Sequence, residues 1–394
     1  MIDLRAALAP YGEDIDARRL DVLDGVRALL VFLVAWFHIW QQSWLSPWVM
    51  VGERFVSLDF LPRAGYMMVD GMLLLSGLLL YLPCAGEKGV MPKTWPFYKK
   101  RLVRVAPSYL LCVLIMLVFV ALPEIRYPSA QMALADVGAH LTFTHTFFSF
   151  SYIGTPLNGA LWTLAVEMQF YLLFPLLARA YKKWPLPTFL LMAAAAFTYR
   201  AYVSTLKDTA MYINQLPAFL DVYALGFFFA EVICRLRARL KEEKRSEKAL
   251  FTLLAVLCAA AVVMVLKEQA GLNGYENIRQ GQMAHRFPLV VSLGGMMVCL
   301  CFSLPAVRFL FGNGLMRFFA AVSFQFYIWH QVFAVQLKKW GIPAAQGAEP
   351  WVSAERPWQL GYTWASFLGA LLIASLVTFA FERPVSRALL KRRA

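Results

Sequence analysis

The sequence predicts an all-α protein, a polytopic membrane helical bundle of about ten transmembrane helices with its N- and C-termini in the cytoplasm. Three observations lead to this prediction. Hydrophobic residues make up 60% of the 394 residues and charged residues only 16%, whereas a soluble domain carries about 25% charge. The apolar residues fall in runs of roughly 17–25, the length that crosses a bilayer as a helix. Lysine and arginine gather in alternate gaps between those runs.

Ten apolar runs predict ten spans along the chain. The first follows a polar segment and shows no cleavage pattern of a signal peptide, so we interpret it as a membrane helix. Polar residues interrupt two of the runs, the fifth at Arg200 and the sixth at Asp221. The expected spans are residues 25–44, 64–82, 103–122, 160–178, 185–204, 213–234, 249–266, 286–306, 316–335 and 361–381.

The distribution of basic residues orients the bundle. Cytoplasmic segments of membrane proteins carry an excess of Lys and Arg. With the N-terminus inside, 27 of the 38 Lys and Arg residues fall on the cytoplasmic side, many of them in the linker 235–248 and the tail 387–393. The spans then divide the chain into a cytoplasmic N-terminal segment at 1–24, a transmembrane domain at 25–384 and a basic cytoplasmic tail at 385–394. Topology and contact with membrane lipids account for this charge.

Composition also bears on partners and metals. The net charge of +14 lies in the gaps between spans, so nucleic acid is not an expected partner. Four of the six cysteines lie inside apolar runs, no CxxC occurs, and no Cys/His spacing resembles a zinc site. We therefore expect neither a disulfide framework nor a metal. The longest predicted outer loop, 123–159, is rich in aromatic residues and could cover an outward-facing site or lie along the interface.

The first span carries an arginine and a histidine that share one helix face. Arg27 and His38 are eleven residues apart, and eleven steps of about 100° return to within roughly 20° of the starting direction. The two side chains then lie about 16 Å apart along the axis. Arg27 at the cytoplasmic mouth could pair with a phosphate-rich carrier whose arm delivers a reactive group to His38. A snorkelling arginine and a buried structural histidine are the alternatives.

The third span opens with a second pair of arginines. Arg101 and Arg104 are three positions apart, which makes them neighbours on one face of a helix. At the cytoplasmic surface this pair could bind the phosphates of a nucleotide. A basic helix end is also an ordinary topology signal.

Three further ionisable residues lie at membrane depth, where such groups are costly and therefore functional candidates. Glu167 in the fourth span lies about 12 Å from its outer end and could orient an imidazole, accept a proton or bind a sugar hydroxyl. Asp70 and His330 belong to the outer halves of the second and ninth spans. They could line an acceptor site, relay protons or form a structural pair. Ser76 and Gly77 are typical of helix packing.

This arrangement suits group transfer across a membrane. Arginines lie at the cytoplasmic face, one histidine lies at mid-depth, and acidic and imidazole groups lie further out. A neutral imidazole could take the proton of a hydroxyl while its oxygen attacks a thioester carbonyl. A proton-coupled transporter or flippase with His38, Glu167 and His330 as a relay fits the same residues. A non-catalytic partner in a polysaccharide-synthesis complex is a third possibility.

The chain resembles the acyltransferase-3 family of membrane-bound bacterial acyltransferases, which O-acylate surface polysaccharides and related acceptors. The resemblance runs in order from about residue 20 to 387 and rests on six short motifs. They are Arg27 with His38, Asp70 with Ser76-Gly77, the Arg101-x-x-Arg104 segment, Leu161-Trp162 through Glu167, Tyr327-Ile328-Trp329-His330, and Glu382-Arg383-Pro384.

The resemblance implies a membrane O-acyltransferase of the inner or plasma membrane, with acetyl-CoA or another acyl-CoA as donor and no metal. It implies that His38 is catalytic and that Arg27, Arg101 and Arg104 bind or gate the acyl-CoA. Glu167 would orient His38 or position the acceptor. The expected acceptor is a hydroxyl-bearing carbohydrate, such as a cell-surface glycan or its lipid-linked precursor.

The chain departs from the family pattern at two places. It has Met168 where the family often has a second acidic residue, and Met72 and Leu73 where aromatic residues usually follow the acidic residue. These departures concern acceptor and acyl-chain preference more than the reaction. The chain ends ten residues after Pro384, so we expect no extra extracellular domain of the kind that some members carry.

Overall fold

The computed structural model describes residues 17–240 and 244–391. Within those residues, ten helical segments are long and apolar enough to cross a membrane. Each of them coincides with one predicted span, so the prediction of a multi-pass helical bundle is confirmed. The segments are Leu20–Ser43, Gly65–Cys84, Thr94–Ala121, Gly159–Lys183, Pro185–Ser204, Leu216–Arg239, Arg245–Ala270, Tyr275–Phe302, Pro305–Lys339 and Arg356–Leu390.

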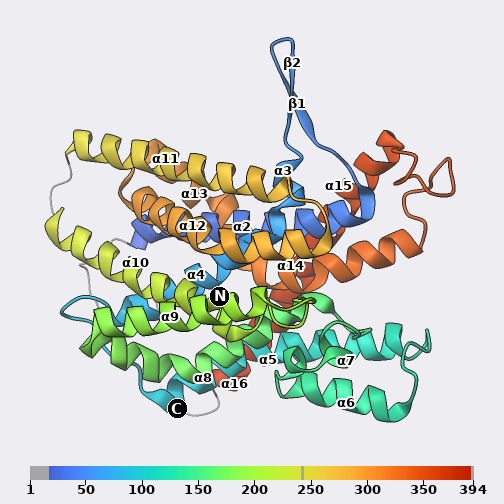
Figure 1. Ribbon diagram of the computed structural model, residues 1–394, viewed down its shortest axis with the longest axis horizontal. Helices are drawn as coiled ribbons and strands as arrows, with labels where there is room; N and C mark the ends of the chain where they lie inside the picture. The colour runs from blue at the N-terminus through green and yellow to red at the C-terminus, as the bar shows by residue number, and fades with distance from the viewer. Residues whose placement is uncertain (1–16, 241–243, 392–394) are drawn as a thin grey trace.

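Long helices make up these segments and run roughly side by side (Figure 1). They are α2 (Ala17–Ser43), α4 (Met68–Tyr81), α5 (Thr94–Met116), α8 (Trp162–Lys183), α9 (Pro185–Ser204), α10 (Leu220–Arg239), α11 (Arg245–Ala270), α12 (Tyr275–Phe302), α14 (Gly314–Lys339) and α15 (Arg356–Val377). Shorter elements connect them: β1 (Trp48–Val51), β2 (Arg54–Ser57), α3 (Phe60–Arg63), α6 (Ala130–Leu141), α7 (Ser149–Tyr152), α13 (Pro305–Gly312) and α16 (Arg383–Lys391).

Several helices begin well before the apolar runs that predicted them. The first begins at Ala17 instead of residue 25, the third at Thr94 instead of 103, and the eighth at Tyr275 instead of 286. Backbone hydrogen bonds continue a helix into the polar region, where hydropathy no longer detects it. Part of the predicted 1–24 segment is therefore helical, and its residues 1–16 lie outside the described residues, as do 392–394 of the predicted tail.

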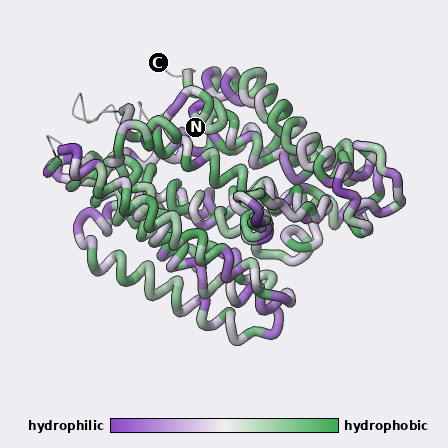
Figure 2. The backbone as a smooth tube through the Cα atoms, turned by 90° about the horizontal axis from the view of Figure 1, so that it is seen from above, coloured by the Kyte–Doolittle hydropathy of each residue, from purple (hydrophilic) through white to green (hydrophobic). Residues whose placement is uncertain are grey.

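Helix α2 lies at the centre of the bundle and packs against α4, α12, α13, α14 and α15. In the second span, α4, 83% of the most apolar window is buried, whereas in the α11 span only 17% is. The bundle therefore has inner helices such as α4 and outer helices such as α11 and α15. Hydrophilic residues are concentrated at helix ends and connections, and the helix bodies are mostly hydrophobic (Figure 2).

Close approach of α4 and α10 depends on small residues. A Cβ at Gly226 would lie 2.7 Å from the Leu78 backbone nitrogen, and one at Gly77 would lie 3.2 Å from Tyr223. Gly77 thus has the packing role that the sequence predicted. Its neighbour Ser76 does not only pack, because its hydroxyl takes part in the site described below.

Two connections have structure of their own. Strands β1 and β2 form an antiparallel hairpin that stands away from the bundle (Figure 1). The segment 123–159 folds into α6, α7 and short turns that lie together at one side of the bundle (Figure 1).

Candidate active site

Among the described residues, three arginines of α2 and α5 each have a guanidinium nitrogen that is buried without a hydrogen-bond partner, as does Arg286 of α12. The nitrogens of α2 and α5 are Nη2 of Arg27, Nε of Arg101 and Nη1 of Arg104. The other terminal nitrogen of Arg27, Nη1, donates to Oδ1 of Asp24 at 3.0 Å. Buried polar groups are nearly always paired, and leaving a charged donor unpaired is costly. These nitrogens are therefore free to bind an anion.

The carboxylate of Glu167 lies with these arginines. It accepts a hydrogen bond from the Ser76 hydroxyl at 2.7 Å and another from the hydroxyl of Tyr171, one helical turn further along α8. The guanidinium carbon of Arg101 lies 5.7 Å from the centre of the Tyr171 ring. Ser76, Glu167 and Tyr171 thus connect α4 to α8 beside the arginine face of α5.

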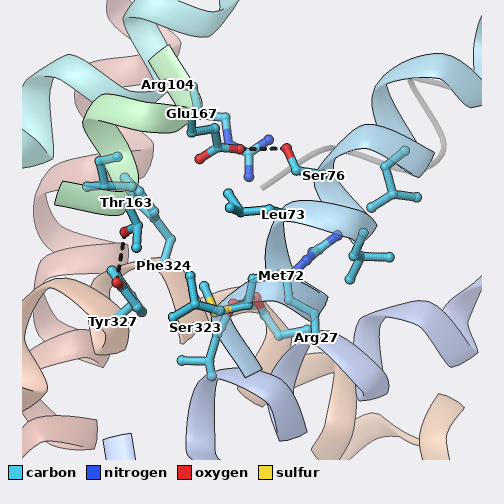
Figure 3. A pocket seen from close by; sticks show the side chains of 17 residues that line it. Arg27, Met72, Leu73, Ser76, Arg104, Thr163, Glu167, Ser323, Phe324 and Tyr327 are labelled. Carbon is cyan, nitrogen blue, oxygen red and sulfur yellow. Dashed lines mark hydrogen bonds between the residues drawn. The ribbon is translucent and has the colours of Figure 1, made fainter. Parts of the chain in front are cut away.

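A small cavity of about 90 Å³ opens between these groups. Arg27, Arg104, Glu167 and Ser76 supply its polar side, and Tyr327 and apolar side chains complete the wall (Figure 3). This volume is well below the roughly 300–1,000 Å³ of a pocket for a whole drug-sized ligand. The cavity can therefore take a narrow arm or an acyl group but not a complete nucleotide.

His38 and His330 lie next to each other. Their ring centres are 5.2 Å apart, and His330 is fully buried while His38 is half-buried. Nδ1 of His330 donates to the Phe326 carbonyl at 3.1 Å, because a carbonyl oxygen only accepts. Nδ1 of His38 donates to Oε1 of Gln41 at 3.2 Å. Both Nε2 atoms are then left without hydrogen and can accept a proton.

Two helices connect the cavity to the histidines. Tyr327 of α14 lines the cavity, and its ring centre lies 5.7 Å from that of His330. The Tyr327 hydroxyl accepts from Thr163 at 2.7 Å and donates to the Ala160 carbonyl at 3.1 Å. On α2, Arg27 and Val31 line the same cavity and His38 lies further along. Tyr327 and α2 therefore connect the arginine-lined cavity to the histidine pair through packed side chains, and neither histidine lines the cavity itself.

The structure places Glu167 apart from His38. The carboxylate of Glu167 bonds to Ser76 and Tyr171, whereas His38 has Gln41 and His330 as its polar neighbours. The described contacts therefore give no orienting bond between Glu167 and His38. The two side chains come from different helices, and a buried carboxylate takes the nearest donors in the packed bundle.

Asp70 is also separated from His330. Its Oδ1 accepts from Nε of Arg286 at 3.2 Å, and both side chains are buried. Arg200 and Asp221, the polar residues that interrupt the fifth and sixth runs, form a second buried pair at 2.7 Å. Both arginines donate to the Ala218 carbonyl. Asp70 thus belongs to a buried cluster of two ion pairs.

Sequence reasoning did not single out Arg286, which is the partner of Asp70. Arg286 is the first residue of the eighth predicted span, so in the sequence it could not be distinguished from an ordinary basic residue at the end of a span. Gln325 was missed as well. Its amide nitrogen donates to Ser108 at 2.6 Å and to Glu382 at 2.9 Å, and its oxygen accepts from Trp329 at 3.2 Å. This amide connects the closing Glu-Arg-Pro motif to α14 beside His330.

Metal ions in proteins are commonly held by side chains of His, Cys, Asp and Glu. In the part of the chain that the structure describes, no group of three such residues is arranged to hold a metal ion.

Comparison with known proteins bears on the identity of this site. The family model described as Acyltransferase domain matches residues 20–387, nearly the whole chain. The chain belongs to the acyltransferase domain family. The matched region contains the three arginines, both histidines and Glu167, which confirms the resemblance seen in the motifs.

Similar curated proteins include O-acetyltransferase OatA of Staphylococcus aureus and peptidoglycan O-acetyltransferase OatA of Listeria monocytogenes. The first is 30% identical over 167 residues, which cover 40% of this chain and 24% of that protein. The second is 27% identical over 171 residues, which cover 41% of this chain and 24% of that protein. The alignments thus span about a quarter of these relatives. No solved structure matches the chain significantly.

Proposed function

We propose that this chain is an O-acetyltransferase of the inner or plasma membrane that moves an acetyl group from acetyl-CoA to a hydroxyl of a cell-wall glycan. The observation that carries the proposal is that Tyr327 both lines the arginine-lined cavity and packs against His330, which lies next to His38. Membership of the acyltransferase domain family supports acyl transfer. The names of the Staphylococcus and Listeria relatives support acetyl as the group and peptidoglycan as the acceptor class.

The donor binds from the cytoplasmic side in this proposal. Coenzyme A carries phosphates, and a guanidinium group is the side chain best suited to them. Arg27, Arg101 and Arg104 hold unpaired buried nitrogens for that purpose. The narrow cavity beyond them takes the thioester arm and not the nucleotide, because its volume is only about 90 Å³.

The histidine pair supplies the base. Nε2 of His38 takes the proton of the acceptor hydroxyl while the hydroxyl oxygen attacks the thioester carbonyl. A carbon–oxygen bond forms, the carbon–sulfur bond breaks, and the thiolate of coenzyme A leaves and is protonated from His38. His330 lies within 5.2 Å, ring centre to ring centre, and shares or relays that proton.

The orientation in the membrane follows from the basic residues. Both termini lie in the cytoplasm, and the domain 25–384 carries the donor site toward the cytoplasm and His38 toward the outside. Glu167 holds the site together through Ser76 and Tyr171 and balances the charge of the arginines.

The deciding experiment compares purified wild-type protein with His38→Ala in nanodiscs. We expect both to bind acetyl-CoA, and we expect the variant to lose at least about 10²-fold in transfer to soluble peptidoglycan chains, the scale of a lost general base. Unchanged turnover in His38→Ala would overturn the mechanism. Folded wild-type protein that binds no acyl-CoA would favour the proton-coupled transporter or flippase instead.

A further inference from the structure

A second cavity, wide open to the molecular surface, lies at the turn between α11 and α12, away from the arginines. Its volume is about 560 Å³, within the usual range for ligand pockets. Its polar lining consists of three amides, one carboxylate and one imidazole, which are Asn273, Asn277, Gln280, Glu268 and His285. The candidate active site does not use any of these side chains.

Backbone conformation and a side-chain hydrogen bond define the shape of the turn between α11 and α12. Gly274 has a φ of 85°, a left-handed conformation that favours glycine, and α12 begins at the next residue. A Cβ at Gly281 would lie 2.1 Å from Cδ1 of Leu272, so a larger residue there would require the Leu272 side chain to move. The amide nitrogen of Gln269 donates to the Ile278 carbonyl at 2.9 Å across the turn.

The lining chemistry suits an uncharged sugar. A side-chain amide both donates and accepts, as do sugar hydroxyls and N-acetyl groups, so amides can pair with either. None of the described residues that line this cavity is Lys or Arg, in contrast to Arg27 and Arg104 in the first cavity. The lining therefore offers no cationic side chain to bind a phosphate or nucleotide, but it offers hydrogen-bond donors and acceptors to a neutral glycan.

A chain of contacts connects this cavity to His38. Nδ1 of His285 donates to Oε1 of Gln269 at 2.7 Å, and the amide nitrogen of the buried Gln269 donates to the Tyr66 hydroxyl at 2.6 Å. The Tyr66 ring centre lies 4.9 Å from the ring centre of Phe37. The ring centres of Phe37 and His38 are 5.0 Å apart. The cavity and the catalytic histidine therefore lie at the same end of the bundle.

We infer that the α11–α12 cavity binds sugar residues of the glycan acceptor and holds the chain so that a hydroxyl reaches His38. This inference rests on the proposed function, since it assigns a substrate site to that reaction. It assigns the donor and the acceptor to separate cavities, one cationic and one rich in amides.

The first test changes the amides and measures each substrate separately. In the double variant Asn273→Ala/Asn277→Ala we expect the KM for soluble peptidoglycan chains to rise at least about tenfold, because each lost hydrogen bond weakens binding several-fold. The Kd for acetyl-CoA should stay within about twofold of wild type. Gln346→Ala is the matched control, since it removes an exposed amide from a different loop.

The second test needs no turnover. Asn277→Cys is labelled with a maleimide in nanodiscs, with unmodified protein as the blank for the six native cysteines. We expect soluble peptidoglycan chains, but not acetyl-CoA, to slow labelling. Unchanged acceptor KM together with unprotected labelling would overturn the cavity assignment while leaving transfer intact. A wild-type protein that transfers no acetyl group would instead overturn the proposed function.

Discussion

At the residue scale, the unusual feature is a set of buried guanidinium nitrogens that have no hydrogen-bond partner. Arg27 has one carboxylate partner, Asp24, and its second terminal nitrogen has none. Arg104 has a buried nitrogen without a partner on the other side of the same cavity. A buried guanidinium nitrogen without a partner destabilises the fold, so stability alone would favour pairing these groups. Their position around one cavity supports the anion site proposed above.

The first prediction separates this site from the general basic character of α5. Arg104→Gln should raise the Kd for acetyl-CoA by at least about tenfold, because a charge-assisted hydrogen bond to phosphate is lost. Lys100→Gln removes the same charge from an exposed position on the same helix and should change the Kd less than about twofold. Isothermal titration of both variants in nanodiscs provides the measurement. Equal effects would mean that only overall charge matters.

The two histidines show that the sequence can identify candidate residues but not how those residues lie relative to each other. The sequence predicted both His38 and His330 as candidates, each from its depth in an apolar run. It did not predict that their rings lie 5.2 Å apart. Neither did it predict that Phe326 and Gln41 orient Nε2 of each ring as the proton acceptor. Those facts depend on how α2 packs against α14.

At the element scale, two buried ion pairs connect four helices. Asp70 on α4 pairs with Arg286 on α12, and Arg200 on α9 pairs with Asp221 on α10. The shared acceptor, the Ala218 carbonyl, brings the pairs together. Arg200 and Asp221 interrupted their own spans as sequence signals, and the partner on another helix explains why each is tolerated.

The second prediction concerns the stability of this cluster. Arg286→Met should destabilise the protein by about 3–5 kcal/mol, since it leaves a buried carboxylate without its partner. The double variant Asp70→Leu/Arg286→Met should recover most of that loss. Asp208→Asn, at an exposed ion pair with Arg279, should cost less than about 1 kcal/mol. Denaturant unfolding in detergent compares the three. A double variant less stable than the single one would contradict the pairing.

The segment 123–159 also buries titratable groups. The rings of His140 and His145 stack at 4.1 Å between centres, and the Tyr109 hydroxyl lies 3.2 Å from Nδ1 of His145. Asp136 accepts hydrogen bonds from Tyr127 at 2.7 Å and from Thr155 at 2.8 Å. This segment is therefore a packed unit and not a loose loop.

The third prediction follows from the burial of His145. Burial, and then the nearby His140, lowers the pKa of His145 from its usual 6.5 to about 3. The folded state thus binds fewer protons than the unfolded state between these values. Its stability is complete above pH 6.5 and falls as the pH drops toward 3, by about 2 kcal/mol at pH 5. Hydrogen exchange of α6 and α7, corrected for intrinsic rates, should show more opening at pH 5 than at pH 7.

A matched variant checks the cause of that change. His145→Phe keeps an aromatic ring in the stack and removes the titratable nitrogen, so opening should no longer depend on pH. Persistent pH dependence in this variant would assign the effect to another group.

At the scale of the whole molecule, the fourth prediction tests the orientation of the bundle. Gly347 lies in the connection between α14 and α15, and Arg239 is the last residue of α10. Each is replaced by cysteine in a separate variant. With the N-terminus inside, a membrane-impermeant maleimide should label Gly347→Cys in intact cells and Arg239→Cys only after permeabilisation. Unmodified protein provides the blank. The reverse pattern would place both termini outside and separate the arginines from cytoplasmic acetyl-CoA.

The sequence by itself determined the class of the protein, its ten spans and the helices that carry the candidate residues. Each of these depends on a local property, namely the length of an apolar run or the spacing of two residues on one helix. The Arg27–His38 and Arg101–Arg104 relations needed no other part of the chain. Helix ends were misplaced by several residues, since hydropathy stops at the edge of the apolar region while the helix continues.

Only the tertiary structure decided which polar groups meet. Asp70 pairs with Arg286, Glu167 with Ser76 and Tyr171, and His38 with His330. Most of these partners are far apart in the sequence, and in a low-dielectric interior a buried polar group must pair with whatever packing brings within reach. The acceptor cavity between α11 and α12 likewise exists only once the two helices are packed against each other.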